Sequence, residues 1–336
     1  SSNTASGYES LYLNTTGNYN IAIGRESLFS NTTAANNVAL GYQASYTNAT
    51  GTPNTAVGYQ ALYANVASNN TATGYQSLYT NTTGTRNTGV GTSAMYTGIT
   101  ANDVTAVGYN ALNLNTGSSN TAVGSTALDT NSTGNNNTAV GYAALTANTS
   151  SFNNSAFGYV SLTSNTTGVR NTASGNSSLF SNTTGNGNGA FGVESLYTNT
   201  TGANNTASGY LSLYNNTTGG NNTASGYQAG RYHADGATAL ATASSSVYIG
   251  ANVRGWSNSD SNSIVIGADA IGAGADTAVL GNDSITRTLL KGNVFVNALA
   301  TNSTTTPTGC VGCLIFASST APTATTTNAI ALFAVD

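Results

Sequence analysis

Few residues of this chain are of the types that perform chemistry. The 336-residue sequence has two cysteines and one histidine, and its cysteines form the motif Cys310-Val-Gly-Cys313. This spacing occurs in zinc half-sites and in redox motifs. With His233 as the one histidine, a second pair of zinc ligands is missing, and no βαβ pattern supports a thioredoxin-like site. We therefore expect a disulfide of Cys310 and Cys313, within the loop or between chains, in an oxidising exterior.

The ionisable residues show no spacing suited to acid-base or nucleophilic catalysis. His233 and Asp235 lie together where a repeat pattern is interrupted. Further carboxylates are scattered, as Asp103, Asp129 and Asp260 are, or recur at one solvated repeat position, as Glu9, Glu26 and Glu194 do. We expect no catalytic residue, no metal site, no cofactor and no enzymatic activity.

A short unit recurs through most of the sequence. Its glycine appears in 14 copies, 17 residues apart except for two intervals of 16: Gly7, Gly24, Gly41, Gly58, Gly74, Gly91, Gly108, Gly124, Gly141, Gly158, Gly175, Gly192, Gly209 and Gly226. So strict a period indicates stacked copies of one supersecondary unit, each burying its apolar face against the next. The pattern predicts an all-β protein, a parallel β-solenoid of 17-residue coils.

Small and large residues alternate around this repeat glycine. Ala stands two residues before it in 13 of 14 copies, and Ala or Ser always stands three after it. Leu follows that small residue in eleven copies, and Val, Ile, Leu or Phe mostly precedes the glycine. We expect two short strands per coil, one on each side of the glycine. Because neighbouring residues of a strand face opposite sides, the small columns would fill a narrow roll.

The large residues of these strands would then need a covering outside the roll. We expect them to pack between chains in a closed cyclic oligomer, a homotrimeric fibre. The residues assigned to this trimer or core packing are Leu11, Leu28, Leu62, Leu78, Leu213, Val57 and Val107.

Asparagine recurs at two further positions. It opens the unit in 13 of 14 copies and returns seven residues after the glycine in most of them. Stacked Asn side chains form hydrogen-bonded ladders, and Asn tolerates turn conformations at corners. Asn14-Thr-Thr and Asn81-Thr-Thr also match glycosylation acceptors. We interpret these as by-products of the repeated corner, unless the chain follows a eukaryotic secretory route.

Composition excludes several classes of protein. Only 5% of residues are charged, against about 25% in ordinary soluble domains. A net charge of -4 with seven Lys plus Arg leaves no basic patch for nucleic acid. No run of about 20 apolar residues predicts membrane insertion. The chain opens at Ser1 without a signal peptide, so we expect a processed product or a piece of something longer.

Three segments near the end carry a family resemblance. Asn-Ser-Ile-Val-Ile-Gly at 262–267, Asp-Thr-Ala-Val-Leu-Gly at 276–281 and the fourteen-residue step between their glycines resemble the head repeats of YadA-like trimeric autotransporter adhesins. Similar repeats occur in tail-fibre proteins of bacteriophages. The resemblance implies a left-handed parallel β-roll that trimerises.

We expect three regions along the chain. Residues 1–236 form a solenoid of 14 coils, residues 237–297 carry the shorter YadA-like repeats, and residues 298–336 form a Thr/Ala-rich β segment. The register break at residues 231–245 is interpreted as a loop or a domain boundary.

Tyrosines form the best candidate for a binding surface. Nine follow the repeat glycine directly: Tyr8, Tyr42, Tyr59, Tyr75, Tyr109, Tyr142, Tyr159, Tyr210 and Tyr227. A second set, including Tyr12, Tyr46 and Tyr63, lies four residues further on. Exposed Tyr rows among Asn and Thr suit sugar or protein surfaces. The alternative is that the rings stack on one another and at chain interfaces.

These patterns favour a non-enzymatic extracellular fibre, at a cell surface or on a virion tail, that attaches to a glycan or protein receptor. Two alternatives stay open. Open solenoid ends would suit a structural filament or sheath subunit. Thr stands three residues before the glycine in ten copies, which would suit an ice-binding solenoid.

Overall fold

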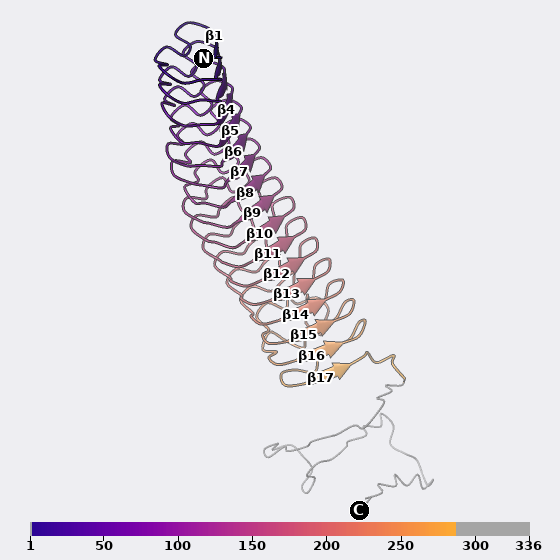
Figure 1. Cartoon of the computed structure of the whole chain (residues 1–336). Coiled ribbons are helices and arrows are strands. Elements are labelled where there is room, and N and C mark those ends of the chain that lie inside the picture. The colour runs from indigo at the N-terminus through magenta and orange to yellow at the C-terminus, as the bar shows by residue number, and fades with distance from the viewer. Residues whose placement is uncertain (1, 287–336) are drawn as a thin grey trace, which may run out of the picture. The chain divides into compact units, whose positions relative to one another are not determined.

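The protein is an all-β parallel solenoid (Figure 1). The computed structural model describes residues 2–286, and it contains 17 short strands and no helix in that part of the chain. Each coil contributes one strand, and the strands stack into one continuous sheet along a rod. The predicted fold class and 17-residue spacing are confirmed. Cys310, Cys313 and the segment 298–336 lie outside the described residues.

The strands all have three or four residues. They are β1 (Thr4–Ser6), β2 (Ile21–Ile23), β3 (Val38–Leu40), β4 (Asn54–Val57), β5 (Asn70–Thr73), β6 (Thr88–Val90), β7 (Thr105–Val107), β8 (Thr121–Val123), β9 (Thr138–Val140), β10 (Ser155–Phe157), β11 (Thr172–Ser174), β12 (Gly189–Phe191), β13 (Thr206–Ser208), β14 (Thr223–Ser225), β15 (Val247–Ile249), β16 (Ile264–Ile266) and β17 (Ala278–Leu280).

Each strand pairs with the next one in the sequence, in parallel and with equivalent positions opposite each other. Between β3 and β4, for example, Ala39 lies opposite Ala56 and Leu40 opposite Val57. The two 16-residue coils keep this register, since Thr105 still lies opposite Thr121. Every repeat position therefore becomes a column of like residues along the rod.

The expected second strand of each coil is wrong. The residues after the repeat glycine form turns, and two of them adopt positive φ, as Gln60 (φ 51°) and Leu62 (φ 52°) do. Two left-handed residues on either side of Ala61 break the alternation of a strand. Ala61 and Leu62 are both fully buried, although they are neighbours. The small and large columns thus share one interior.

The leucines therefore belong to the core of the single chain. Leu28, Leu62, Leu78 and Leu213 are buried by their own coils, and Leu11 in the first coil is partly buried. Val57 and Val107 precede the glycine and lie half-buried on the outer side of the sheet. The expectation that the Leu column points out of the roll is wrong, because the turn directs it inward.

Backbone hydrogen bonds continue from coil to coil through these turns. The Leu62 amide donates to the Ser77 carbonyl over 3.0 Å, and the Gln76 amide donates to the Tyr59 carbonyl over 2.9 Å. The Ala64 amide donates likewise to the Tyr79 carbonyl. Since the turn backbone is satisfied by the neighbouring coil, its left-handed residues are held as firmly as the strands.

Two buried asparagine ladders run along the interior, which confirms that part of the sequence analysis. Asn182 Nδ2 donates to Asn165 Oδ1 over 2.9 Å and also to the Gly185 carbonyl. Asn199 Nδ2 donates in turn to Asn182 Oδ1 over 2.8 Å. At the strand starts, the Asn205 amide donates to Asn188 Oδ1. Asn81 is fully buried, so its Asn-Thr-Thr motif is inaccessible to glycosylation in the folded chain.

The register break is a loop, and the sheet continues across it. Strand β14 pairs directly with β15, with Thr223 opposite Val247. In β15 the buried central residue is Tyr248 instead of Ala, and Gly230 stands where Leu is usual. A Cβ at Gly230 would lie 2.9 Å from the Tyr248 ring, so the missing Leu side chain makes room for the tyrosine.

Substitution in the glycine column is expected to disrupt stacking. Gly141 has φ +138°, and a Cβ there would lie 2.3 Å from the Gly158 carbonyl oxygen. We expect Gly141→Ala to lower the free energy of unfolding by about 2–6 kcal/mol, from backbone strain plus overpacking, in urea titration. Gly187→Asn is the control, because Asn204 occupies the equivalent position of the next coil. Equal loss in both variants would contradict this account.

The asparagine ladder gives a second prediction. Asn182→Ala leaves Asn165 Oδ1 and Asn199 Nδ2 without their partner in the interior. We expect a loss of about 2–5 kcal/mol in the free energy of unfolding, from two unsatisfied buried groups. The exposed Asn18→Ala serves as control, because Ala35 occupies the equivalent position of the next coil, and its unfolding midpoint should stay near that of the parent chain. A midpoint for Asn182→Ala equal to that of the control would refute the role of the ladder.

Candidate binding surface

The ionisable residues of the loop act locally. Asp235 accepts hydrogen bonds from the Ala237 and Thr238 amides and from the Thr238 hydroxyl. These bonds lower the pKa of Asp235 to about 2, so it remains ionised and shapes the turn. His233 donates its backbone amide to the Thr238 carbonyl within the same loop. The side chains of His233 and Asp235 form no hydrogen bond with each other, so they do not make an acid–base pair.

Asp103 and Asp260 are likewise held by nearby residues. Arg86 and Asp103 form an ion pair between successive coils at 2.5 Å, and the Arg86 hydrogen bond lowers the pKa of Asp103. The buried Asp260 accepts from the Trp256 and Ser257 amides and fixes that turn. Within residues 2–286, no three His, Cys, Asp or Glu residues cluster to hold a metal ion.

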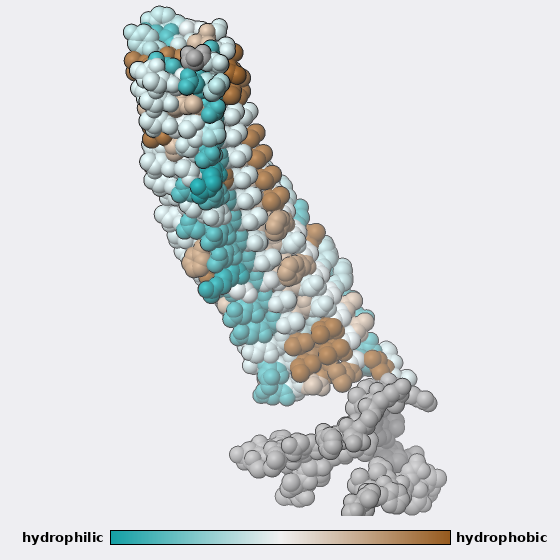
Figure 2. Space-filling model, viewed as in Figure 1, coloured by the Kyte–Doolittle hydropathy of each residue, from teal (hydrophilic) through white to brown (hydrophobic). Residues whose placement is uncertain are grey.

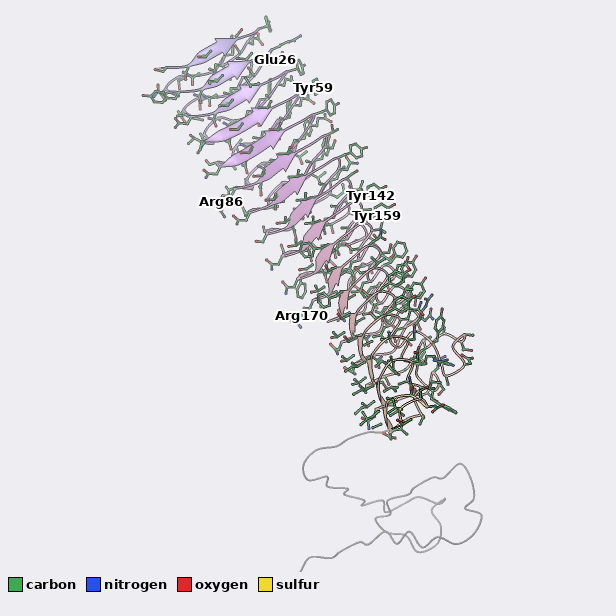
Figure 3. The ribbon with its side chains drawn as sticks, turned by 90° about the vertical axis from the view of Figure 1, so that its right-hand side faces the viewer. Glu26, Tyr59, Arg86, Tyr142, Tyr159 and Arg170 are labelled. Carbon is green, nitrogen blue, oxygen red and sulfur yellow. The ribbon has the colours of Figure 1, made fainter. Side chains whose placement is uncertain are left out.

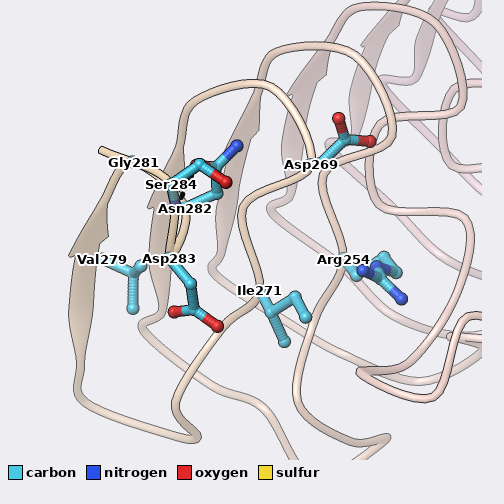
Figure 4. Close-up of a pocket in the computed structure, with 8 residues that line it drawn as sticks. All are labelled: Arg254, Asp269, Ile271, Val279, Gly281, Asn282, Asp283 and Ser284. Carbon is cyan, nitrogen blue, oxygen red and sulfur yellow. Dashed lines mark hydrogen bonds between the residues drawn. The ribbon is translucent and has the colours of Figure 1, made fainter. Parts of the chain in front are cut away.

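A hollow of about 330 Å³ lies at the last described coils (Figure 4). Its polar lining includes Arg254, Asp269 and Asp283. Arg254 donates to the Ala234 carbonyl, and Asp269 accepts from Asn252, so both groups already have partners. The hollow shows no arrangement of a nucleophile with a base.

The first aromatic column consists of the nine tyrosines that follow the repeat glycines. Eight of them are exposed, and Tyr42 is half-exposed. Figure 3 shows Tyr59, Tyr142 and Tyr159 along one long edge of the rod, with Arg86 and Arg170 along the opposite edge. Stacks join Tyr42 to Tyr59, Tyr59 to Tyr75, Tyr142 to Tyr159 and Tyr210 to Tyr227, with ring centroids 5.1–5.6 Å apart.

A second aromatic column lies beside the first. It stacks six rings without a break over the first coils: Tyr12, Phe29, Tyr46, Tyr63, Tyr79 and Tyr96. It resumes with Phe180, Tyr197 and Tyr214. Burial raises the pKa of Tyr79, and its stacked neighbours Tyr63 and Tyr96 raise it further. Because the rings of this column lie only four residues after the first-column position in the same turn, the two columns run along the same part of the rod.

An amide ladder accompanies the aromatic columns. Gln43 Nε2 donates to Glu26 Oε2 over 2.7 Å, Gln60 Nε2 donates to Gln43 Oε1, and Gln76 Nε2 donates to Gln60 Oε1. The Gln43 hydrogen bond lowers the pKa of Glu26, with a smaller contribution from Arg25. The position two residues after the repeat glycine, which the sequence analysis interpreted as a solvated face, is therefore an ordered row of hydrogen-bonded polar side chains from Glu26 to Gln76.

Arginines take the place of rings in these columns. The Arg25 guanidinium lies 5.5 Å from the Tyr8 ring centroid and 6.0 Å from that of Tyr42. Arg231 follows Tyr214 in the second column, at 4.7 Å from its ring centroid. A guanidinium is planar and is attracted to the negative face of an aromatic ring, so it continues a stack.

Stacking decides what the tyrosines can offer a ligand. Inside a stack, each ring has another ring on both faces, so mainly ring edges and hydroxyl groups meet the solvent. Sugar recognition by stacking needs a free face. Tyr109 has none of these stacking partners and is 56% exposed, because its column neighbours are Thr92 and Ser125. The open faces lie where a column is interrupted.

The outer side of the sheet carries two further columns. The threonine column is the position three residues before the repeat glycine, where Thr is the commonest residue. The apolar column is the last residue of each strand, which is apolar in 12 of the 17 described strands, as in Val123 and Phe157, and Ser or Thr in the other five. Figure 2 shows hydrophobic patches along this side of the rod, the largest near its last strands. There both columns are apolar, with Val247 and Ile249 in β15 and Ile264 and Ile266 in β16.

The fold and these surface columns define the class of protein: it is a β-solenoid repeat protein. Comparison with protein-family models and with curated protein sequences finds no match to this chain. No helix in the described part of the chain has the length and hydrophobicity needed to cross a bilayer.

Truncating a stacked ring and an unstacked ring should have different effects. Tyr63 lies between Tyr46 and Tyr79 at 5.2 Å and 5.1 Å. We expect Tyr63→Ala to cost about 1–3 kcal/mol of unfolding free energy through the loss of two ring pairs. Tyr109→Ala should cost less than about 1 kcal/mol. Thermal unfolding followed by circular dichroism checks this, and equal shifts would show that stacking contributes nothing.

Proposed function

We propose that this protein is a non-enzymatic extracellular fibre protein, a rigid trimeric β-solenoid that attaches to a cell surface. It would be a shaft or head element of a phage tail fibre or a bacterial adhesin. The trimer and the left-handed sense of the β-roll belong to this proposal. Its receptor would be a cell-surface glycan or protein.

The outer apolar column is the observation that carries the proposal. Ile23, Val90, Val123, Phe157 and Phe191 expose between 37% and 45% of their surface, although each lies in a regular strand. An apolar stripe that recurs along a rod marks a surface for association. Its burial contributes about 25 cal/mol per Å² of apolar surface, and closed symmetry would cover the stripe on every chain.

Rigidity supports the role of a shaft. Each described coil is hydrogen-bonded to the next through its strand and its turn, and most coils are also joined by asparagine ladders. Bending the rod would break all three sets together. The resemblance of residues 262–281 to YadA-like head repeats favours the same function.

The two other candidate functions have less support. An ice-binding surface requires a flat and regular face, and the rings of Phe157 and Phe191 interrupt the outer face beside the threonine column. A filament of stacked chains would use the free edge of β1, as any open sheet does.

Charges in the apolar column are expected to dissociate the assembly. We expect the parent chain to sediment as a trimer, and the double variant Val123→Glu with Phe157→Glu as a monomer with an unchanged circular dichroism spectrum. Buried unpaired carboxylates at an interface are costly, whereas both side chains lie outside the core of the chain. Thr133→Glu with Ser150→Glu, at exposed turn positions, is the control. A parent chain that is monomeric at all concentrations would overturn the fibre assignment.

A further inference from the structure

The second aromatic column has one long interruption. Between Tyr96 and Phe180, four successive coils hold Asn113, Asp129, Thr146 and Thr163 at the ring position, and we call these four positions the aromatic gap. Within residues 2–286, Tyr96 stacks on no ring other than Tyr79, and Phe180 on none other than Tyr197. Each therefore lacks an aromatic ring on the face that it turns toward the gap. Five coil spacings separate the two rings, roughly 24 Å at the distance between neighbouring strands.

Asp129 places a carboxylate within this gap. It is half-buried, and its carboxylate makes no hydrogen bond or ion pair to other residues in the described range 2–286. The next two residues of the column do not bind this carboxylate through their hydroxyl groups. The Thr146 hydroxyl donates to the Thr126 carbonyl, and the Thr163 hydroxyl donates to the Ala143 carbonyl. Burial raises the pKa of Asp129. Desolvation of an unpaired carboxylate makes a cationic partner favourable there.

The surroundings of the gap suit a cation. The first aromatic column runs beside it and supplies Tyr109, Tyr142 and Tyr159. No Lys, Arg or His occurs in either aromatic column between residues 92 and 180. A positive group in the gap would thus meet aromatic rings and one carboxylate, without a like charge from these columns.

The chain itself shows what fits between its rings. Arg25 lies between Tyr8 and Tyr42, and Arg231 continues the stack beyond Tyr214. At the gap, Tyr96 and Phe180 present similar ring faces, but neither aromatic column has an arginine there. Arg25 also pairs with the neighbouring Glu26 at 2.9 Å, so ring and carboxylate act together on one guanidinium.

We propose that the aromatic gap is a docking site for an extended, arginine-containing segment of a partner protein. Its guanidinium groups would stack on the free faces of Tyr96 and Phe180 and pair with Asp129. An extended segment of about seven residues spans this distance. The arginine-containing segment would be the partner that the attachment surface of the proposed fibre binds. Only the biological role of the docking site rests on that proposed function.

The test uses the whole chain and a synthetic peptide of seven residues in which Arg and Gly alternate. Isothermal titration calorimetry in low salt should show binding, and replacement of each Arg by citrulline should abolish it. Asp129→Asn should weaken the peptide affinity about tenfold, through loss of the ion pair. Asn113 already holds an amide one coil earlier, so this variant retains a tolerated side chain. Asp129→Tyr should also weaken binding, because it removes the carboxylate and places a ring in the middle of the gap.

Glu194→Gln is the matched control, because it removes the same charge in a coil beyond the gap. Its affinity for the peptide should equal that of the parent chain. Equal weakening by Asp129→Asn and Glu194→Gln would show general charge attraction and overturn the proposal. Binding of neutral oligosaccharides at the gap without binding of the arginine peptide would also overturn it. A monomeric chain that binds the peptide with the expected dependence on Asp129 would contradict the fibre assignment and support this inference.

Discussion

The structure depends on one constraint: in the stacked coils of residues 2–286, each repeat position lies beside its equivalents in the coils before and after it. Glycine, alanine and asparagine satisfy this constraint in different ways. The glycines allow close backbone approach, since a Cβ at Gly58 would lie 2.4 Å from the Gly74 carbonyl oxygen. Alanine fills a narrow interior, and asparagine is both donor and acceptor to its own kind. Charged residues repel their equivalents, which explains why only 5% of the chain is charged.

Several of the charges that do occur are paired with a neighbouring residue. Arg86 lies one coil before Asp103 and pairs with it. Glu26 follows Glu9 in the same column, and it accepts from Gln43 of the next coil and pairs with Arg25. The left-handed turn residues obey the same logic. Each costs about 1–2 kcal/mol in isolation. The cost is offset because the turn amides and carbonyls are hydrogen-bonded by the next coil, as between Gln76 and Tyr59. Stability is therefore a property of neighbouring coils together.

The outer columns are free of this packing constraint, so they vary more and carry the surface chemistry. Where tyrosines occupy successive coils, their ring faces stack on one another, and the surface presents mainly ring edges and hydroxyl groups. Where the column is broken, between Tyr96 and Phe180, polar side chains that include the carboxylate of Asp129 take the place of rings. The proposed docking site lies at one of these interruptions.

The sequence by itself determined the period, the parallel stacking, the narrow alanine core and the asparagine ladders, because each follows from like residues meeting at one coil spacing. It did not determine the direction of Leu62. Strand alternation would direct that side chain outward, and only the left-handed turn, held by hydrogen bonds to the next coil, directs it inward. Nor did the sequence decide between exposed and stacked tyrosines. Ring orientation depends on which column lies beside which, and that is set by the path of the turn in three dimensions.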